Sequence, residues 1–200
     1  MAKHPITCTQ YHVFLTAPDG DANGKHWKGL MRIDDGGTQR RQVSSHPAQN
    51  VSWFDATAFC RWLSGRLGFE VRLPFEWEWE QAATGGNPGN TYPWGTDWDA
   101  TRANNSESRL QRTMAVGMYP GGASNQGVLD LCGNVGEWCA NAFDDPRLLD
   151  QKATTRVRRA VRGSRGINRV RVRSGARNYQ DPSGRHYGVG FRVVCVSPIP

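Results

Sequence analysis

Residues 127–138, GVLDLCGNVGEW, indicate the fold more clearly than any other stretch of the chain. Apolar residues occur there singly or in pairs, and Gly and Asn interrupt them. The same texture recurs in RAVRG (159–163) and GFRVV (190–194). Short apolar pieces between Gly, Asn, Pro and Asp are typical of short strands joined by elaborate loops. We therefore expect small sheets and ordered loops beyond Gly85.

The chain before Gly85 has helical patterns instead. Three segments are predicted to be helical: CTQYHVFLTA (8–17), VSWFDATAFCRWLSGRLG (51–68) and VRLPFEWEWEQAATGG (71–86). In the second segment, apolar residues recur at helical spacing, and Gly65 and Gly68 are candidate ends. Those apolar residues are Phe59, Trp62, Leu63 and Leu67. WEWE (77–80) is interpreted as a core Trp beside a solvated or paired Glu, with Trp77 and Glu80 on one face. Helices followed by strands suggest an α+β domain.

Length and composition favour a single globular domain. Two hundred residues are enough to bury a core, and 23 Gly with 11 Pro predict abundant loops. Eight Trp argue against disorder. No apolar run is long enough to span a bilayer. The start of the chain, MAKHPITCTQYHVFL, lacks the pattern of a signal peptide, so we expect a cytoplasmic protein or one exported without a classical signal.

The five cysteines give no sign of a disulfide framework. Their number is odd, and no CxxC pair occurs that could hold zinc. We expect buried free thiols, since free Cys is among the most buried residue types.

Charge is distributed unevenly along the chain. Residues 151–200 carry eleven Arg and one Lys against a single acid, a net charge of +11, whereas residues 1–150 carry −4. Such asymmetry marks a face that meets an anionic or polar partner.

Six blocks in order resemble one known family. They are HPAQNVSWFDATAFCRWLS, RLPFEWEWEQAATGG, YPWG, GVLDLCGNVGEW, RAVRG and GFRVV. Together they resemble the formylglycine-generating (sulfatase-modifying factor) domain from about residue 9 to residue 196. The resemblance implies one C-type lectin-like domain over residues 1–200, with two main helices, short twisted sheets and many ordered loops.

The resemblance implies the fold of the family but not the catalytic activity of its enzyme members. Enzyme members of the family use a pair of Cys in the C-terminal segment to bind copper, which favours soft thiolate ligands. This chain has no Cys between Cys139 and Cys195. We therefore expect a protein that is not an enzyme and requires no cofactor.

The same family implies a structural calcium ion at GVLDLCGNVGEW. Carried over by position, the ligands would be the side chains of Asp130 and Glu137 and the carbonyls of Gly133 and Val135. Oxygen ligands suit Ca²⁺. The alternative is a structural turn in which the two acids cap backbone N–H groups.

The C-terminal segment VRSGARNYQDPSGRHYGVGFRVV (172–194) resembles, more narrowly, variable proteins of diversity-generating retroelements. There, a reverse transcriptase copies a template repeat into the 3′ end of a gene and randomises its adenines. The resemblance implies a variable ligand-binding region within residues 160–192. Its candidate contact residues are Arg165, Ile167, Asn168, Arg169, Arg171, Gly175, Ala176, Tyr179, Gln180, Asp181, Ser183, Gly184, His186, Tyr187 and Gly188.

Frame residues separate these candidate positions. They are Val172, Arg173, Ser174, Arg177, Asn178, Pro182, Arg185, Gly190, Phe191 and Arg192. We expect the frame Arg residues to hold the loops by hydrogen bonds and salt bridges, with acids such as Glu78, Glu80 and Glu137 as partners. For Tyr179 and Tyr187 the alternative to ligand binding is ordinary half-buried packing.

A binding function follows from this pattern. Diversity is tolerable only where side chains have no packing role, which means exposed loops on a rigid scaffold. Tyr, Ser, Gly and Arg also dominate antibody binding sites. We expect a non-enzymatic recognition protein with a protein or other surface macromolecule as its ligand. The alternative is a fixed-specificity sensor module of a larger signalling protein. Nucleic-acid binding through the basic segment is the least favoured, because no RNP or helix-turn-helix pattern occurs.

Overall fold

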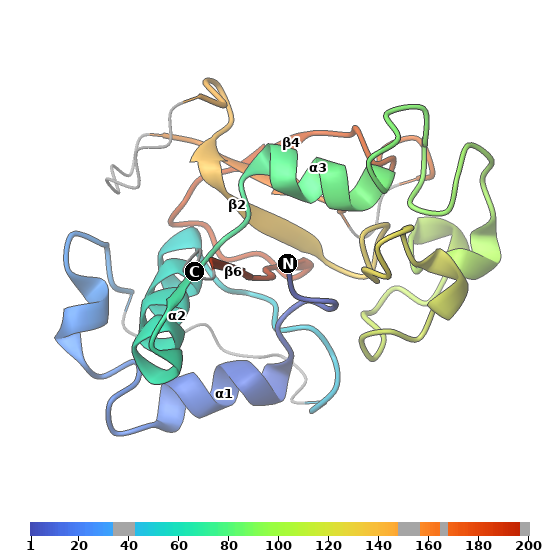
Figure 1. Cartoon of the computed structure of the whole chain (residues 1–200). Helices are drawn as coiled ribbons and strands as arrows, with labels where there is room; N and C mark the ends of the chain where they lie inside the picture. The colour runs from blue at the N-terminus through green and yellow to red at the C-terminus, as the bar shows by residue number, and fades with distance from the viewer. Residues whose placement is uncertain (34–42, 148–156, 165–167, 197–200) are drawn as a thin grey trace.

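Three α-helices form the first half of the fold in the computed structural model, which describes residues 1–33, 43–147, 157–164 and 168–196 (Figure 1). They are α1 (Cys8–Thr16), α2 (Trp53–Leu67) and α3 (Glu76–Thr84). The three predicted helical segments are thus confirmed, where the family resemblance implied two main helices. Short 3-10 turns lie between α1 and α2 and after α3. They are η1 (Gly24–Trp27), η2 (Ala100–Arg102), η3 (Ser106–Ser108) and η4 (Pro120–Gly122).

Capping explains the limits of α2. Ser52 Oγ accepts the backbone N–H of Asp55, and Asp55 Oδ2 accepts that of Ser52 (3.1 and 2.7 Å), which satisfies two amides at the helix start. Gly68 ends the helix with φ at 76°, a left-handed conformation that favours glycine. Leu67 was predicted on the buried face but is exposed, because it is the last helical residue.

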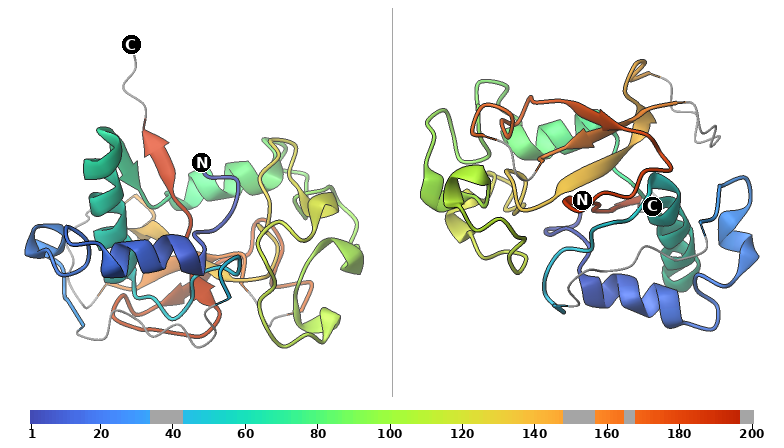
Figure 2. Two further views of the ribbon diagram at one scale, coloured as in Figure 1. Left: turned by 90° about the horizontal axis from the view of Figure 1, so that it is seen from below. Right: turned by 180° about the vertical axis from the view of Figure 1, so that it is seen from behind.

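Two small sheets complete the fold (Figures 1 and 2). β1 (Glu70–Arg72) pairs antiparallel with β6 (Val194–Val196). The second sheet has the order β4-β3-β2-β5. Its strands are β2 (Gly136–Ala142), β3 (Arg159–Arg162), β4 (Asn178–Gln180) and β5 (Val189–Gly190). Only the β2–β5 pair is parallel, and β4 lies at an edge.

The main core joins the two ends of the chain. Rings from α1 and α2 pack around Phe191, whose ring centroid lies 5.2 Å from that of Phe59. A second cluster lies beneath α3 around Trp79, and a third contains Tyr92, Ala103, Cys132 and Val172. Long loops connect the helices and strands in Figure 1. The architecture is therefore the α+β fold with small sheets and many loops that the sequence predicted.

The WEWE prediction is only partly right. Trp79, and not Trp77, is the core residue, and its indole Nε1 donates to Glu137 Oε2 (2.7 Å). Trp77 is 48% exposed and stacks on Phe75, with ring centroids 4.5 Å apart. Glu80 is the paired acid, since it binds Arg162 (2.9 Å).

Cys8, Cys60, Cys132 and Cys139 are buried, as predicted, whereas Cys195 is exposed. Across the described ranges, no helix is long and apolar enough to cross a membrane.

Candidate ligand-binding surface

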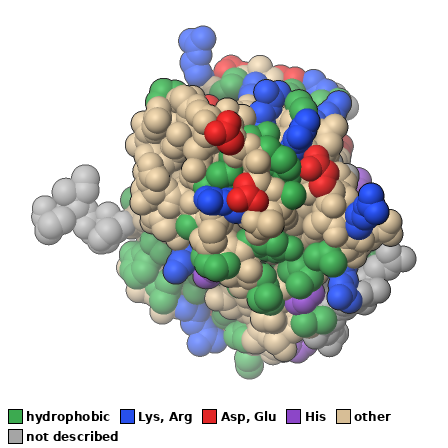
Figure 3. All heavy atoms as spheres, turned by 90° about the vertical axis from the view of Figure 1, so that its right-hand side faces the viewer, with side chains coloured by type: hydrophobic (Ala, Val, Ile, Leu, Met, Phe, Trp, Pro, Cys, Tyr) green, Lys and Arg blue, Asp and Glu red, His purple; other side chains and the backbone are tan. Residues whose placement is uncertain are grey.

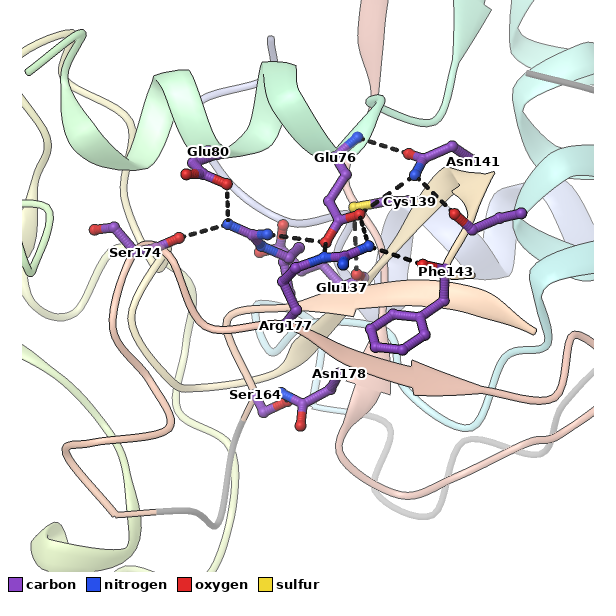
Figure 4. A network of polar contacts seen from close by, with 12 residues as sticks. Glu76, Glu80, Glu137, Cys139, Asn141, Phe143, Ser164, Ser174, Arg177 and Asn178 are labelled. Carbon is purple, nitrogen blue, oxygen red and sulfur yellow. Dashed lines mark hydrogen bonds and ion pairs between the residues drawn. The ribbon is translucent and has the colours of Figure 1, made fainter. Parts of the chain in front are cut away.

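Frame residue Arg177 is anchored on the buried carboxylate of Glu76 (Figure 4). Arg177 donates twice to Glu76 (2.6 and 2.9 Å), and Arg162 of β3 donates once (2.9 Å). Arg162 also donates to the carbonyl of Ser174 (2.6 Å). Burial alone would raise the pKa of Glu76, but the two guanidinium groups outweigh it and lower the pKa. Glu76 at the start of α3 thus holds the C-terminal segment directly at Arg177 and, through Arg162, at Ser174.

Frame residue Arg185 is anchored in the same way on α2. Its guanidinium binds both carboxylate oxygens of Asp55 at 2.8 Å. Two backbone bonds add to this contact, since the amide of Trp53 donates to Pro182 (3.0 Å) and that of Asn50 donates to His186 (3.1 Å). The loop 181–188 is therefore fixed over the N-terminal end of α2.

Frame residue Arg192 forms an ion pair with the Glu137 carboxylate, which the sequence predicted as a calcium ligand. Its guanidinium binds Glu137 at 2.5 and 2.6 Å, and both side chains are fully buried. Asp130 accepts the backbone N–H of Gly117 (2.7 Å). The carbonyl of Gly133 accepts the N–H of Val135 (2.8 Å). These residues do not fit a calcium site that uses Glu137 as a ligand. The bond from Gly117 N–H to Asp130 fits the alternative, a structural turn in which this acid caps a backbone N–H group.

Frame residue Arg173 has a different role. It is exposed, and its Nε donates to the carbonyl of Val170 (2.8 Å), within its own loop. Three of the four frame Arg residues therefore bind acids. Of the acids predicted as partners, Glu137 binds Arg192, whereas Glu78 binds Arg72 and Glu80 binds Arg162.

Most of the candidate contact residues face solvent between buried frame residues. Val172, Ser174, Pro182 and Phe191 of the frame are buried. The candidates divide into two classes by exposure, while Arg165 and Ile167 lie outside the described residues. Exposed are Asn168, Arg169, Arg171, Gly175, Tyr179, Asp181, His186 and Tyr187, and partly exposed are Ala176, Gln180, Ser183, Gly184 and Gly188.

Tyr179 lies on the edge strand β4 within a stack of rings and guanidinium groups. It is 46% exposed, and the guanidinium carbon of Arg158 lies 4.1 Å from its ring centroid. Phe143 packs beside it at 4.9 Å and also contacts Arg177. Arg158 is held in place by Asp144. Tyr179 therefore presents a supported, half-exposed ring, and sequence patterns gave no signal for Phe143 or Arg158.

The candidate residues divide between two supports. The segment 168–176 rests on the loops that contain residues 91–108, because Arg169 N–H donates to Glu107 (3.2 Å) and Ser174 N–H donates to Thr91 (2.9 Å). The segment 181–188 rests on α2, as described above. The predicted residues therefore lie on two separately anchored segments of the C-terminal region.

Comparison with known proteins identifies the family. Residues 1–196 match the family described as the sulfatase-modifying factor enzyme 1-like domain. The formylglycine-generating enzyme of Streptomyces coelicolor is 30% identical over 223 residues, which cover 92% of this chain and 67% of that enzyme. The chain belongs to this family.

Relatives within the family differ in activity. The serine/threonine-protein kinase Pkn1 of Chlamydia trachomatis is 36% identical over 148 residues, which cover 70% of this chain and 22% of the kinase. The inactive C-alpha-formylglycine-generating enzyme 2 of Mus musculus is 33% identical over 197 residues, 88% of this chain and 59% of that protein. The chain therefore spans about a fifth of the length of the kinase. Both active and inactive relatives match it.

The fold also matches a solved variable protein. Treponema denticola variable protein 1 superposes with a TM-score of 0.71 over 96% of this chain and 82% of that one, at 23% identity. At this identity the likeness concerns the fold alone.

Proposed function

We propose that this domain is a non-enzymatic recognition module whose exposed residues within 168–188 bind a protein or other surface macromolecule. The observation that carries the proposal is the separation of roles in the C-terminal segment. Frame residues Arg177 and Arg185 anchor the loops on the buried acids Glu76 and Asp55, while most residues between them are exposed or partly exposed. Side chains with no packing role can change without loss of the fold.

The proposal includes diversification by a retroelement. Support comes from the frame of the segment 172–194 and from the shared fold with a variable protein. A catalytic role in the manner of the family's oxidases is not part of it, because the C-terminal segment lacks the cysteine pair. The four buried thiols have raised pKa values, since burial disfavours the thiolate.

The first test is to sequence the DNA that flanks the gene. The proposal expects a near-copy of the codons for about residues 160–192, which differs only at adenines and lies beside a reverse-transcriptase gene. The codons that differ would then identify the contact residues. Absence of such a copy overturns the retroelement part of the proposal.

The second test is binding by the protein itself. A library of displayed random peptides is selected on the immobilised full chain, and the selected binders are measured against a variant with Tyr179, Tyr187 and Arg169 replaced by Ala. Binding is expected to fall at least about tenfold, as for residues at the centre of an interface. The melting temperature of the variant serves as the control, because a large decrease would mean that these side chains belong to the core.

A second candidate function is a fixed-specificity sensor module within a larger signalling protein. The similarity to the kinase Pkn1 favours it. It shares the exposed surface but predicts no template copy beside the gene. The flanking DNA therefore separates the two functions.

A further inference from the structure

Five Arg residues on neighbouring loops have no acidic partner within the described ranges. They are Arg109, Arg112, Arg169, Arg171 and Arg173, and we call them the Arg rim. All five are exposed. Elsewhere, exposed Arg residues do pair with acids, as Arg66 does with Asp19 and Arg158 with Asp144. Among the residues that the structure describes, the guanidinium groups of the Arg rim thus form no ion pair, and the rim carries a net positive charge.

Glu107 joins the two loops of the Arg rim. Its Oε1 accepts the backbone N–H of Arg169 (3.2 Å), and its Oε2 accepts the indole N–H of Trp98 (3.0 Å). Tyr92 adds a bond from its hydroxyl to the carbonyl of Arg169 (3.4 Å). Val172 is buried beneath in the cluster around Tyr92. Residues more than fifty positions apart in sequence thus form one continuous surface.

The loop 105–112 is held in its conformation by hydrogen bonds within the protein. Asn104 is buried, and its side chain accepts from Ser108 Oγ and donates to the carbonyl of Arg112, both at 2.9 Å. Arg109 and Gln111 have φ of 55° and 49°, the left-handed region that non-glycine residues rarely adopt. Strained backbone of this kind persists where the surroundings impose it, and it clusters at functional sites. The loop therefore presents its side chains in a fixed arrangement.

Apolar side chains lie between the charges. Val170 is 49% exposed and Leu110 is 37% exposed, each next in sequence to an Arg of the rim. Figure 3 faces the side of the molecule on which these loops lie, and it shows Lys and Arg side chains, with some Asp and Glu, scattered among hydrophobic ones. A guanidinium group binds a carboxylate through two parallel hydrogen bonds, and an adjacent apolar side chain gains by contact with another apolar surface.

We propose that the Arg rim binds an acidic protein segment in which carboxylates alternate with apolar residues. This inference rests on the proposed recognition function, and it adds Arg109, Leu110 and Arg112 to the binding surface. Charge complementarity fixes which partners fit and speeds their encounter. A nucleic acid fits less well, because its backbone offers phosphates at short regular intervals and nothing for Val170 and Leu110 to contact.

The test uses defined probes and the full chain. Probe one is a twelve-residue peptide of alternating Glu and Leu, probe two is a twelve-residue peptide of Glu and Ser, and probe three is a single-stranded DNA of the same charge. Binding is measured by fluorescence anisotropy at two salt concentrations. The variants are R109E/R112E and R169E/R171E. The matched control is K25E/K28E, which makes the same charge change at two exposed Lys, one within the turn η1 and one directly after it.

The Glu–Leu peptide is expected to bind most tightly. Each double variant in the Arg rim should weaken it by at least about tenfold, roughly the effect of losing one charged contact at an interface. K25E/K28E should leave it within about twofold. Equal loss in the control, or tighter binding of the DNA, overturns the inference. The selection of random peptides separates it from the proposed function. Binders that need Tyr179 and Tyr187 but not the Arg rim would leave the recognition function standing and this inference wrong.

Discussion

Glu76 shows how one side chain can hold a distant segment of the chain. It is buried at the first turn of α3, and it accepts hydrogen bonds from Arg162 and Arg177, which lie 86 and 101 positions away. Asn141 adds a bond from its amide. Taking charges out of water is costly, so a buried carboxylate of this kind is tolerable only when it is fully paired.

Replacement of Glu76 by Ala is expected to lower the free energy of unfolding by about 3–5 kcal/mol, because Arg162 would remain buried without its main partner. Glu80 offers the matched control. It binds the same guanidinium group from an exposed position, so Glu80→Ala should cost about 1 kcal/mol or less. Urea unfolding of the two variants measures the difference. Equal effects would show that Glu76 does not carry the anchor.

The same residue gives the fold a dependence on pH. Arg177 and Arg162 hold the pKa of Glu76 below its ordinary value despite its burial. Its contribution to stability is therefore complete above the unfolded pKa of about 4.3, and it is lost as the pH falls through the lower folded pKa. Comparison of wild type with Glu76→Gln by urea unfolding should show a gap that is constant from pH 7 to pH 5 and narrows below pH 4. A gap independent of pH would contradict this assignment.

Among the elements, α2 supports the loop 181–188, part of the proposed binding surface, through its N-terminal end. Asp55 accepts the N–H of Ser52 in the capping box and binds Arg185 at the same time. Backbone bonds from Asn50 and Trp53 hold the loop 181–188 at two further points. One end of a helix therefore sets the position of residues that come 130 positions later.

Arg185→Ala is expected to loosen this loop more than the rest of the molecule. Asp55 would lose its cation, so the amides of Asn50 and Trp53, which donate to the loop, should exchange with solvent at least about tenfold faster. Hydrogen exchange with mass spectrometry measures this. Ser183→Ala is the control, because the hydrogen bonds of Ser183 to the described residues go to Asp181, within the loop itself. Uniform acceleration over all helices would point to global destabilisation instead.

The sequence predicts some elements better than others for a physical reason. The limits of α2 follow from Ser52, Asp55 and Gly68, which act through neighbouring backbone groups. The anchors of the frame Arg residues depend on how α2 and α3 lie against the second sheet, which no local pattern encodes. For that reason Glu76 and Asp55 were missed as partners, although Arg177 and Arg185 were expected to be structural.

The candidate surface was predictable to a similar extent. The frame positions follow from the family resemblance, and the structure buries Val172, Ser174 and Pro182 of the frame but leaves Arg173 and Arg177 exposed. The contributions of Phe143 and Arg158 come from segments that only folding brings to Tyr179. The position of Arg192 beside Glu137 could not be predicted from either motif alone, because the two lie 55 positions apart in sequence.

At the scale of the whole molecule, the reactivity of the cysteine thiols measures whether the core is closed. Cys8, Cys60, Cys132 and Cys139 are buried, and Cys195 is exposed on β6. We expect a thiol reagent such as DTNB to react rapidly with one cysteine per native chain, and with all five after denaturation in urea. Rapid reaction of two or more in the native state would show that one of the clusters is open. Cys195→Ser is the control, because it should abolish the rapid phase.

The two ends of the described chain are joined to each other. The amide of Ala2 donates to Val193 and that of Ile6 to Phe191, while Arg192 donates to the carbonyl of Ala2. Such pairings join residues up to 190 positions apart, and contacts of this range slow folding. During synthesis, residues 2–6 must therefore wait for residues 191–193 to leave the ribosome. The main core around Phe191 cannot close before that point, so most of the domain is translated before its helices find their final packing partner.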